Sequence, residues 1–223
     1  MREAPGILRA VRHHPSGVLL VGQLLVVLAY PFLENSTAGR AVLGVVQMVV
    51  VLAAVAAVRL TPALSWVALL LGLPATVFAV LESVEPTTEW ITLASACVHA
   101  PFYFYVSYAM IRYLFHDDRV TRDELFATGA AFTVVAWAFA YVFAAVQVLW
   151  PGSFVESGPP RAWFELLFLS FTNLTSVGLS DILPLDSHAR SFVMVEQIAG
   201  VLYVALVIAR LVGLTVARST PRA

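Results

Sequence analysis

The sequence has no lysine, a single cysteine and few charges of either sign. All 13 basic residues are arginine, and charged residues make up 12% of the 223 positions, about half of the ~25% usual in globular proteins. The net charge of −1 leaves no basic surface for nucleic acid. Cys97 alone excludes an intrachain disulfide and a cysteine metal cluster, and we expect it to be a small residue buried in a helix.

Groups that could perform catalysis are also sparse. The five histidines are scattered, and no serine lies on an activating turn, so the sequence does not predict an enzyme or a cofactor. His99 has no second histidine or carboxylate at ligand spacing, and we expect it to hydrogen-bond between helices. The aromatic run Phe102 to Tyr105 is expected to pack helices together.

What the chain has in abundance is apolar residues. They form 60% of the sequence, and the mean hydropathy is +0.86, which predicts an all-α protein that crosses a membrane several times. A helix needs about 20 apolar residues to cross a bilayer. Such runs predict six spans, at about Val18–Leu33, Ala41–Val58, Leu64–Val84, Trp90–Leu114, Leu125–Leu149 and Phe192–Val216.

The arginines predict how these spans are oriented. If the spans alternate, most arginines fall on one side and only Arg40, Arg161 and Arg190 on the other, while Arg210 lies inside the last span. Because arginine-rich loops stay in the cytoplasm, both termini are expected there, in a multi-pass protein of the plasma membrane. No small-residue cleavage site follows the N-terminal segment, so residues 1–15 read as a cytoplasmic lead-in.

The spacing of the spans predicts two domains. Residues 1–115 would form a four-helix front domain, 116–124 a cytoplasmic linker and 125–223 a second domain. Thr121 and Glu124 have the spacing of a capping box that starts the fifth helix. The fourth span carries only Arg112, so the front domain lacks the regularly spaced arginines of a voltage sensor.

A shorter apolar stretch separates the last two spans. Trp163–Leu174 follows Pro159 and Pro160, which suit a helix start, but its dozen residues are too few to cross a bilayer. A polar segment unsuited to helix then runs to Asp181. Irregular backbone at membrane depth persists only where protein buries it or where it lines water. A short re-entrant helix, a polar strand and a full span predict an ion pore.

The polar segment also resembles a known signature. Thr175-Ser176-Val177-Gly178-Leu179-Ser180-Asp181 is similar to the T-T-V-G-Y-G-D selectivity filter of potassium channels. Arg190-Ser191, Glu196, Gly200 and Leu202–Ala205 resemble the inner helix of bacterial potassium channels, members of the tetrameric pore-loop cation channel superfamily. The resemblance covers about residues 124–218.

This resemblance implies a homotetramer in a lipid bilayer that conducts monovalent cations passively, since one chain supplies only one filter segment. Potassium ions would be bound by the backbone carbonyls of Ser176, Val177, Gly178 and Leu179, with the Ser176 hydroxyl at the inner end. Val177 would pack behind the filter. Asp181 would brace the filter through a hydrogen bond or attract cations to its mouth.

Two departures from the signature leave the ion preference open. Leu179 replaces an aromatic residue, and Ser180 replaces a glycine that usually has positive φ, at a cost of ~1 kcal/mol if that geometry is kept. The outer filter could therefore be loose, and Ser180→Gly would then sharpen selectivity. The alternatives are a potassium-preferring channel, a weakly selective cation channel and a non-conducting scaffold or sensor. A potassium-transporter subunit is disfavoured, because such chains usually carry four pore loops.

Two inner-helix residues admit two interpretations each. Glu196 is either a brace behind the pore helix or a group for gating or proton sensing, because an ionisable residue at membrane depth is a functional candidate. Gly200 is either a gating hinge or a glycine that allows two helices to pack closely.

Overall fold

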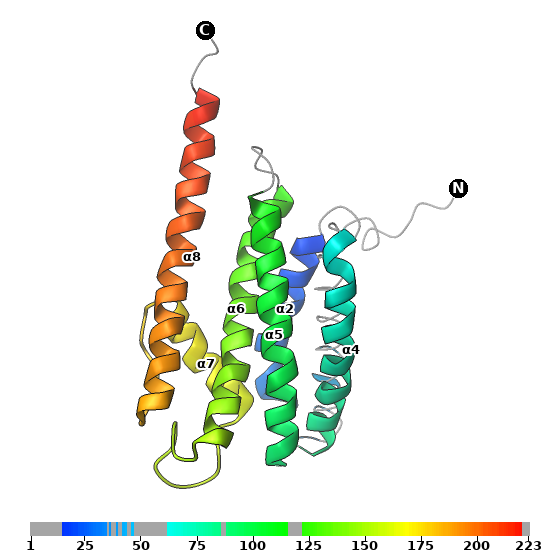
Figure 1. Cartoon of the computed structure of the whole chain (residues 1–223), viewed down its shortest axis with the longest axis vertical. Coiled ribbons are helices and arrows are strands. Elements are labelled where there is room, and N and C mark those ends of the chain that lie inside the picture. The colour runs from blue at the N-terminus through cyan, green and yellow to red at the C-terminus, as the bar shows by residue number, and fades with distance from the viewer. Residues whose placement is uncertain are drawn as a thin grey trace, which may run out of the picture.

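The computed structural model describes residues 15–34, 36, 39, 42–43, 46, 62–85, 88–115 and 122–219. The helices in these ranges with defined bounds are α2 (Pro15–Leu33), α4 (Pro62–Val84), α5 (Glu89–Leu114), α6 (Arg122–Leu149), α7 (Trp163–Leu174) and α8 (Ser187–Ser219). The long helices stand side by side in a bundle, and the short helix α7 slants between α6 and α8 (Figure 1). The predicted bounds of Trp163–Leu174 are confirmed.

Three of the described helices are long and apolar enough to cross a membrane. They are Pro15–Leu33, Asp123–Leu149 and Ser187–Gly213, which match the first, fifth and sixth predicted spans. Helices α4 and α5 have 23 and 26 residues but are not among the three. Most of the second predicted span, the N-terminal lead-in before Pro15 and Thr121 of the predicted capping box lie outside the described residues, so the count of six stays a prediction.

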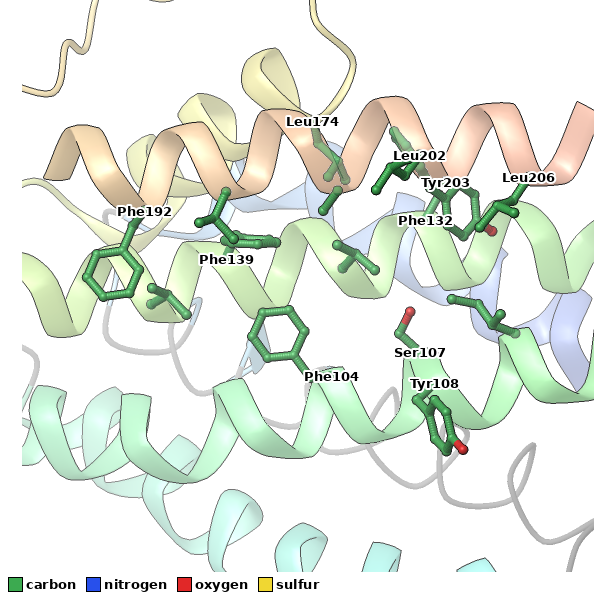
Figure 2. Close-up of a pocket in the computed structure, with 15 residues that line it drawn as sticks. Phe104, Ser107, Tyr108, Phe132, Phe139, Leu174, Phe192, Leu202, Tyr203 and Leu206 are labelled. Carbon is green, nitrogen blue, oxygen red and sulfur yellow. The ribbon is translucent and has the colours of Figure 1, made fainter. Parts of the chain in front are cut away.

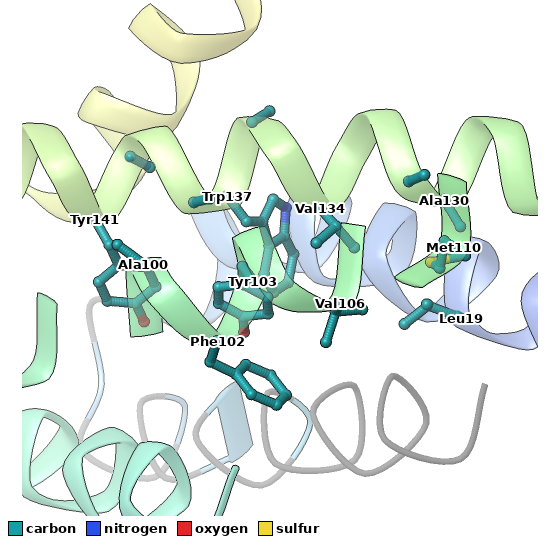
Figure 3. Close-up of a cluster of buried hydrophobic side chains, with 14 of the residues drawn as sticks. Leu19, Ala100, Phe102, Tyr103, Val106, Met110, Ala130, Val134, Trp137 and Tyr141 are labelled. Atoms are coloured by element: carbon teal, nitrogen blue, oxygen red, sulfur yellow. The ribbon is translucent and has the colours of Figure 1, made fainter. Parts of the chain in front are cut away.

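Helix α6 is the central element of the bundle. One apolar core, including Tyr103 and Trp137, joins α5 and α6 to α2 and α7 (Figure 3). A second core joins α6 to α7 and α8. Helices α2 and α5 of the predicted front domain thus pack directly on α6, whereas α4 packs against α5.

Aromatic rings fill the centre of the first core. His99 is fully buried and stacks on Tyr141, with ring centroids 4.4 Å apart. Its Nδ1 lies 3.0 Å from both Ser95 Oγ and the Ser95 carbonyl oxygen, so its hydrogen bonds stay within α5 and stacking makes the contact between helices. Phe102 and Tyr103 are fully buried, which confirms their predicted role in packing.

Cys97 does not lie where we expected. It is exposed, because it lies on the same stripe of α5 as the exposed residues Trp90 and Pro101. A lone small apolar residue carries no information about which helix face it occupies, so its burial could not be decided from composition.

Two acidic residues at the start of α6 connect it to other helices. Both oxygens of the buried Asp123 carboxylate accept hydrogen bonds from Ser16 of α2, one from the backbone N–H at 3.2 Å and one from the hydroxyl at 3.0 Å. Glu124 lies 3.5 Å from Arg210 of α8, and both side chains are at least nine-tenths buried. Glu124 therefore pairs with the inner helix, a contact that its expected role in a capping box did not predict.

Candidate functional site: a pore helix and an irregular strand

The position of α7, the predicted pore helix, is fixed where the chain returns from α6. The side-chain amide of Gln147 forms two hydrogen bonds of 3.0 Å with Arg161, one to its backbone carbonyl and one from its backbone N–H. Glu165 then accepts a 2.7 Å hydrogen bond from the backbone N–H of Ala162, which satisfies one free donor at the helix start. Sequence analysis missed Gln147, because its partner is backbone and leaves no pattern.

Helix α7 buries one face and leaves the other open. Leu166, Leu167 and Leu169 are at most 2% exposed, whereas Phe168 is 47% exposed. At the carboxyl end, the backbone N–H and the hydroxyl of Thr175 both donate to the Phe171 carbonyl, at 3.1 and 2.6 Å. These bonds end the helix and start the polar strand.

The polar strand, which is the irregular segment Thr175–Asp181 and not a β-strand, alternates in backbone conformation at its start. Ser176 has φ of 60° and Gly178 has φ of 67°, whereas Val177 has no positive φ. The N–H groups of Ser176 and Gly178 donate to the Asn173 and Thr172 carbonyls of α7, both at 2.9 Å. When residues with φ of opposite sign alternate, successive peptide groups point in the same direction. The shape of the strand is therefore set by its backbone and by the hydrogen bonds that join it to α7.

The carbonyl oxygens of this strand are largely unengaged. Within the described ranges, no hydrogen bond is donated to the carbonyls of Ser176, Val177 or Leu179, while the Gly178 carbonyl accepts one from the Ser180 N–H at 3.1 Å. The same ranges hold no group of three His, Cys, Asp or Glu side chains placed for a metal. A cation at this strand would therefore be bound by backbone oxygens, the type of ligand that suits a selectivity filter.

The strain that we expected at Ser180 lies instead at Ser176. Ser180 does not have positive φ, and its hydroxyl accepts a 3.0 Å hydrogen bond from the Ile182 N–H. The serine side chain thus makes a local turn that glycine could not make. Ser176 is the non-glycine residue with positive φ in the described ranges, which costs about 1 kcal/mol or more.

Three predicted filter residues make few contacts within one chain. Val177 is 67% and Leu179 77% exposed, so Val177 does not pack behind the strand inside its own chain. Asp181 is exposed, and the described part of the chain gives it no hydrogen bond or ion pair. Any packing of these side chains would require further subunits.

Glu196 of α8 lies behind the pore helix. It is fully buried, and its Oε1 accepts a hydrogen bond from the hydroxyl of Ser170 on α7. Its carboxyl also neighbours the side chain of Asn173. Glu196 therefore connects α8 to the buried face of α7.

Gly200 lies where α8 crosses the carboxyl end of α7. A Cβ at this position would overlap the backbone carbonyl oxygen of Leu174, the last residue of α7. Only glycine allows this approach, which supports the interpretation as a packing glycine. If Gly200 also acts as a hinge in gating, it does so in addition to making this contact.

A third connection lies between the loop after α6 and the start of α8. Asp186 accepts hydrogen bonds from the Ala189 backbone N–H at 2.7 Å and from the Ser153 hydroxyl at 2.9 Å. His188 stacks on Trp150 with centroids 4.2 Å apart. Asp186 thus caps α8 and ties it to the loop after α6. An aspartate directly before a helix is a capping signal, which could have been found from the sequence.

The comparisons with known proteins agree with this geometry. A family model described as an ion channel matches residues 128–217, which span most of α6, all of α7 and the polar strand, and most of α8. No curated protein and no solved structure matches the chain. The match supports a pore-loop ion channel and a membrane protein that handles cations.

Substitution of Gly200 by alanine should destabilise the protein by roughly 1–3 kcal/mol, because the new methyl group displaces the pore helix. Gly213→Ala is the matched control, since nothing lies within 4 Å of a Cβ there. Thermal unfolding in detergent measures both. Equal melting temperatures for the two variants would show that the contact at Leu174 is not tight.

Asp186 should make stability depend on pH. The hydrogen bond from the Ala189 N–H lowers the pKa of Asp186 below its usual value. Ser153 and His188 also lower this pKa, whereas desolvation raises it by less than these groups lower it. The stabilisation is therefore complete above the unfolded pKa of ~3.9 and is lost as pH falls through the lower folded pKa. Asp186→Asn should lower the melting temperature at pH 7, and the difference should shrink in acid. A difference in melting temperature that stays the same at all pH values would contradict this prediction.

Glu196 variants separate a brace from a charge-dependent gate. Glu196→Gln keeps an oxygen for the Ser170 hydroxyl and should stay near wild-type stability, whereas Glu196→Ala should lose about 1–3 kcal/mol. A brace also predicts that the current of Glu196→Gln keeps its pH dependence. Loss of that dependence at unchanged stability would instead assign Glu196 to proton sensing.

Proposed function

We propose that this protein is a passive cation channel of the plasma membrane, built as a homotetramer whose filter is Thr175–Asp181 and whose preferred ion is potassium. The proposal rests chiefly on one observation. The polar strand has positive φ at Ser176 and Gly178, and the N–H groups of these two residues bond to carbonyls at the carboxyl end of α7. The channel-family match over residues 128–217 supports it.

The pore helix contributes electrostatically in this proposal. The carboxyl end of a helix carries a partial negative charge, and α7 ends at Leu174 directly before the strand. Four such ends around one axis would stabilise a cation before it enters the filter. Dehydration of the ion would then be offset by the carbonyls of Ser176, Val177, Gly178 and Leu179, with no cofactor and no chemical step.

A weakly selective cation channel is the second candidate, and Ser180 favours it. Its hydroxyl accepts from the Ile182 N–H, and its own N–H donates to Gly178, which engages one of the four proposed ligand carbonyls. This local turn replaces the geometry that a second glycine would give. The outer end of the filter would then offer a cation fewer fixed oxygens.

The decisive measurement is the reversal potential of purified protein in planar bilayers under a potassium-against-sodium gradient. A value near the potassium equilibrium potential supports the proposal, and a value near zero with unitary currents supports the weakly selective channel. Gly178→Ala should abolish the current, because alanine at φ of 67° costs roughly 1 kcal/mol or more in each subunit.

Gly158→Ala is the control for that variant. Gly158 also has positive φ, at 109°, and nothing lies within 4 Å of a Cβ at either glycine, but Gly158 lies in the loop before α7. It should conduct like the wild type. No current from the wild type across pH and voltage, in protein that is folded and assembled, contradicts the channel proposal and favours a scaffold.

A further inference from the structure

An apolar groove runs along the bundle between α5, α6 and α8 (Figure 2). Its volume is about 560 Å³, within the range of ~300–1,000 Å³ found for ligand sites. Phe104, Phe132, Phe139 and Leu202 are among the side chains that line it. None of the residues of the polar strand, Thr175–Asp181, lines it.

Two of the three hydroxyl groups that line the groove, those of Ser107 and Tyr203, are already engaged, and the third belongs to Tyr108 near one end. The Ser107 hydroxyl donates to the Ala131 carbonyl at 3.4 Å, and the Tyr203 hydroxyl donates to the Thr128 carbonyl at 2.6 Å. A polar ligand placed there would lose its hydrogen bonds to water without replacement, which is costly. The middle of the groove therefore suits a hydrocarbon chain.

The shape of the groove points to the same ligand. Along α8 its wall extends from Phe192 to Leu206, and at 1.5 Å per residue this is a path of about 20 Å. Both α6 and α8 are long and apolar enough to cross a membrane. A groove parallel to such helices runs in the direction of the lipid acyl chains around them.

A cation lies at one end of the groove. Tyr108 of α5 lines the groove (Figure 2), and the guanidinium carbon of Arg112 lies 6.0 Å from the centre of its ring. Arg112 is exposed, one helical turn beyond Tyr108 towards the end of α5. A guanidinium group binds phosphate through two parallel hydrogen bonds, so this end suits an anionic headgroup.

We propose that the groove binds an anionic phospholipid, with an acyl chain along α5, α6 and α8 and the phosphate at Arg112. Leu174 and Ala199 both line the groove, and they adjoin the contact between Gly200 and the end of the pore helix. A bound chain would therefore touch both helices that set the position of the strand. The site goes beyond the proposed function and does not require conduction.

The test uses photo-crosslinking in vesicles, a readout that is independent of ion flux. The full chain is reconstituted in phosphatidylcholine containing phosphatidylglycerol with a diazirine in its acyl chain, and adducts are mapped by peptide mass spectrometry. We expect adducts at the groove walls. Val135→Phe, which fills the groove, should reduce them severalfold, whereas Val77→Phe, on an exposed position of α4 outside the groove, should not.

Arg112→Gln changes an exposed side chain and tests the headgroup separately. The comparison uses two probes with the same diazirine chain, one of phosphatidylglycerol and one of phosphatidylcholine. In the wild type, the anionic probe should label the groove severalfold more than the phosphatidylcholine probe. In Arg112→Gln, the two probes should label it about equally. Labelling spread evenly over exposed helix faces, or unaffected by Val135→Phe, overturns the site. A groove that stays unlabelled in the folded, assembled protein would show that protein, such as a second copy of the chain, covers it, and would also overturn the proposal.

Discussion

The carbonyl of Leu174 lies against Gly200, and the position of the polar strand depends on this contact. The last residue of the pore helix approaches the inner helix so closely that a Cβ on α8 would overlap it. From there the strand begins, and its N–H groups at Ser176 and Gly178 bond back to α7. The backbone that would face an ion is therefore fixed by two helices rather than by its own side chains.

The rest of the bundle keeps these two helices in place. Glu196 and Ser170 connect α8 to α7 on the buried side, while Asp186 and Ser153 connect the start of α8 to the loop after α6. At the other end of α6, Glu124 pairs with Arg210 of α8. Since α6 shares its apolar core with α2 and α5, movement of the front helices would reach the inner helix through α6.

Polar groups in this chain therefore have two separate uses. Several of those inside the bundle pair between helices, such as Asp123 with Ser16 and Glu196 with Ser170, because an unpaired polar group costs several kcal/mol in a medium without water. Those of the strand remain open, with unengaged carbonyls at Ser176 and Val177. The same contrast separates the strand from the apolar groove, where the hydroxyls of Ser107 and Tyr203 are bonded to backbone and hydrocarbon is the suitable ligand.

The sequence by itself determined the helices and the signature of the strand. Apolar runs depend on local hydrophobicity, so Trp163–Leu174 was predicted to its bounds, and Gly178 was identified from its neighbours along the chain. Contacts between distant residues required the tertiary structure. It placed the strain at Ser176 rather than Ser180, left Cys97 exposed, and brought Gln147 to Arg161, because these outcomes depend on backbone torsions and on helix faces that meet only after folding.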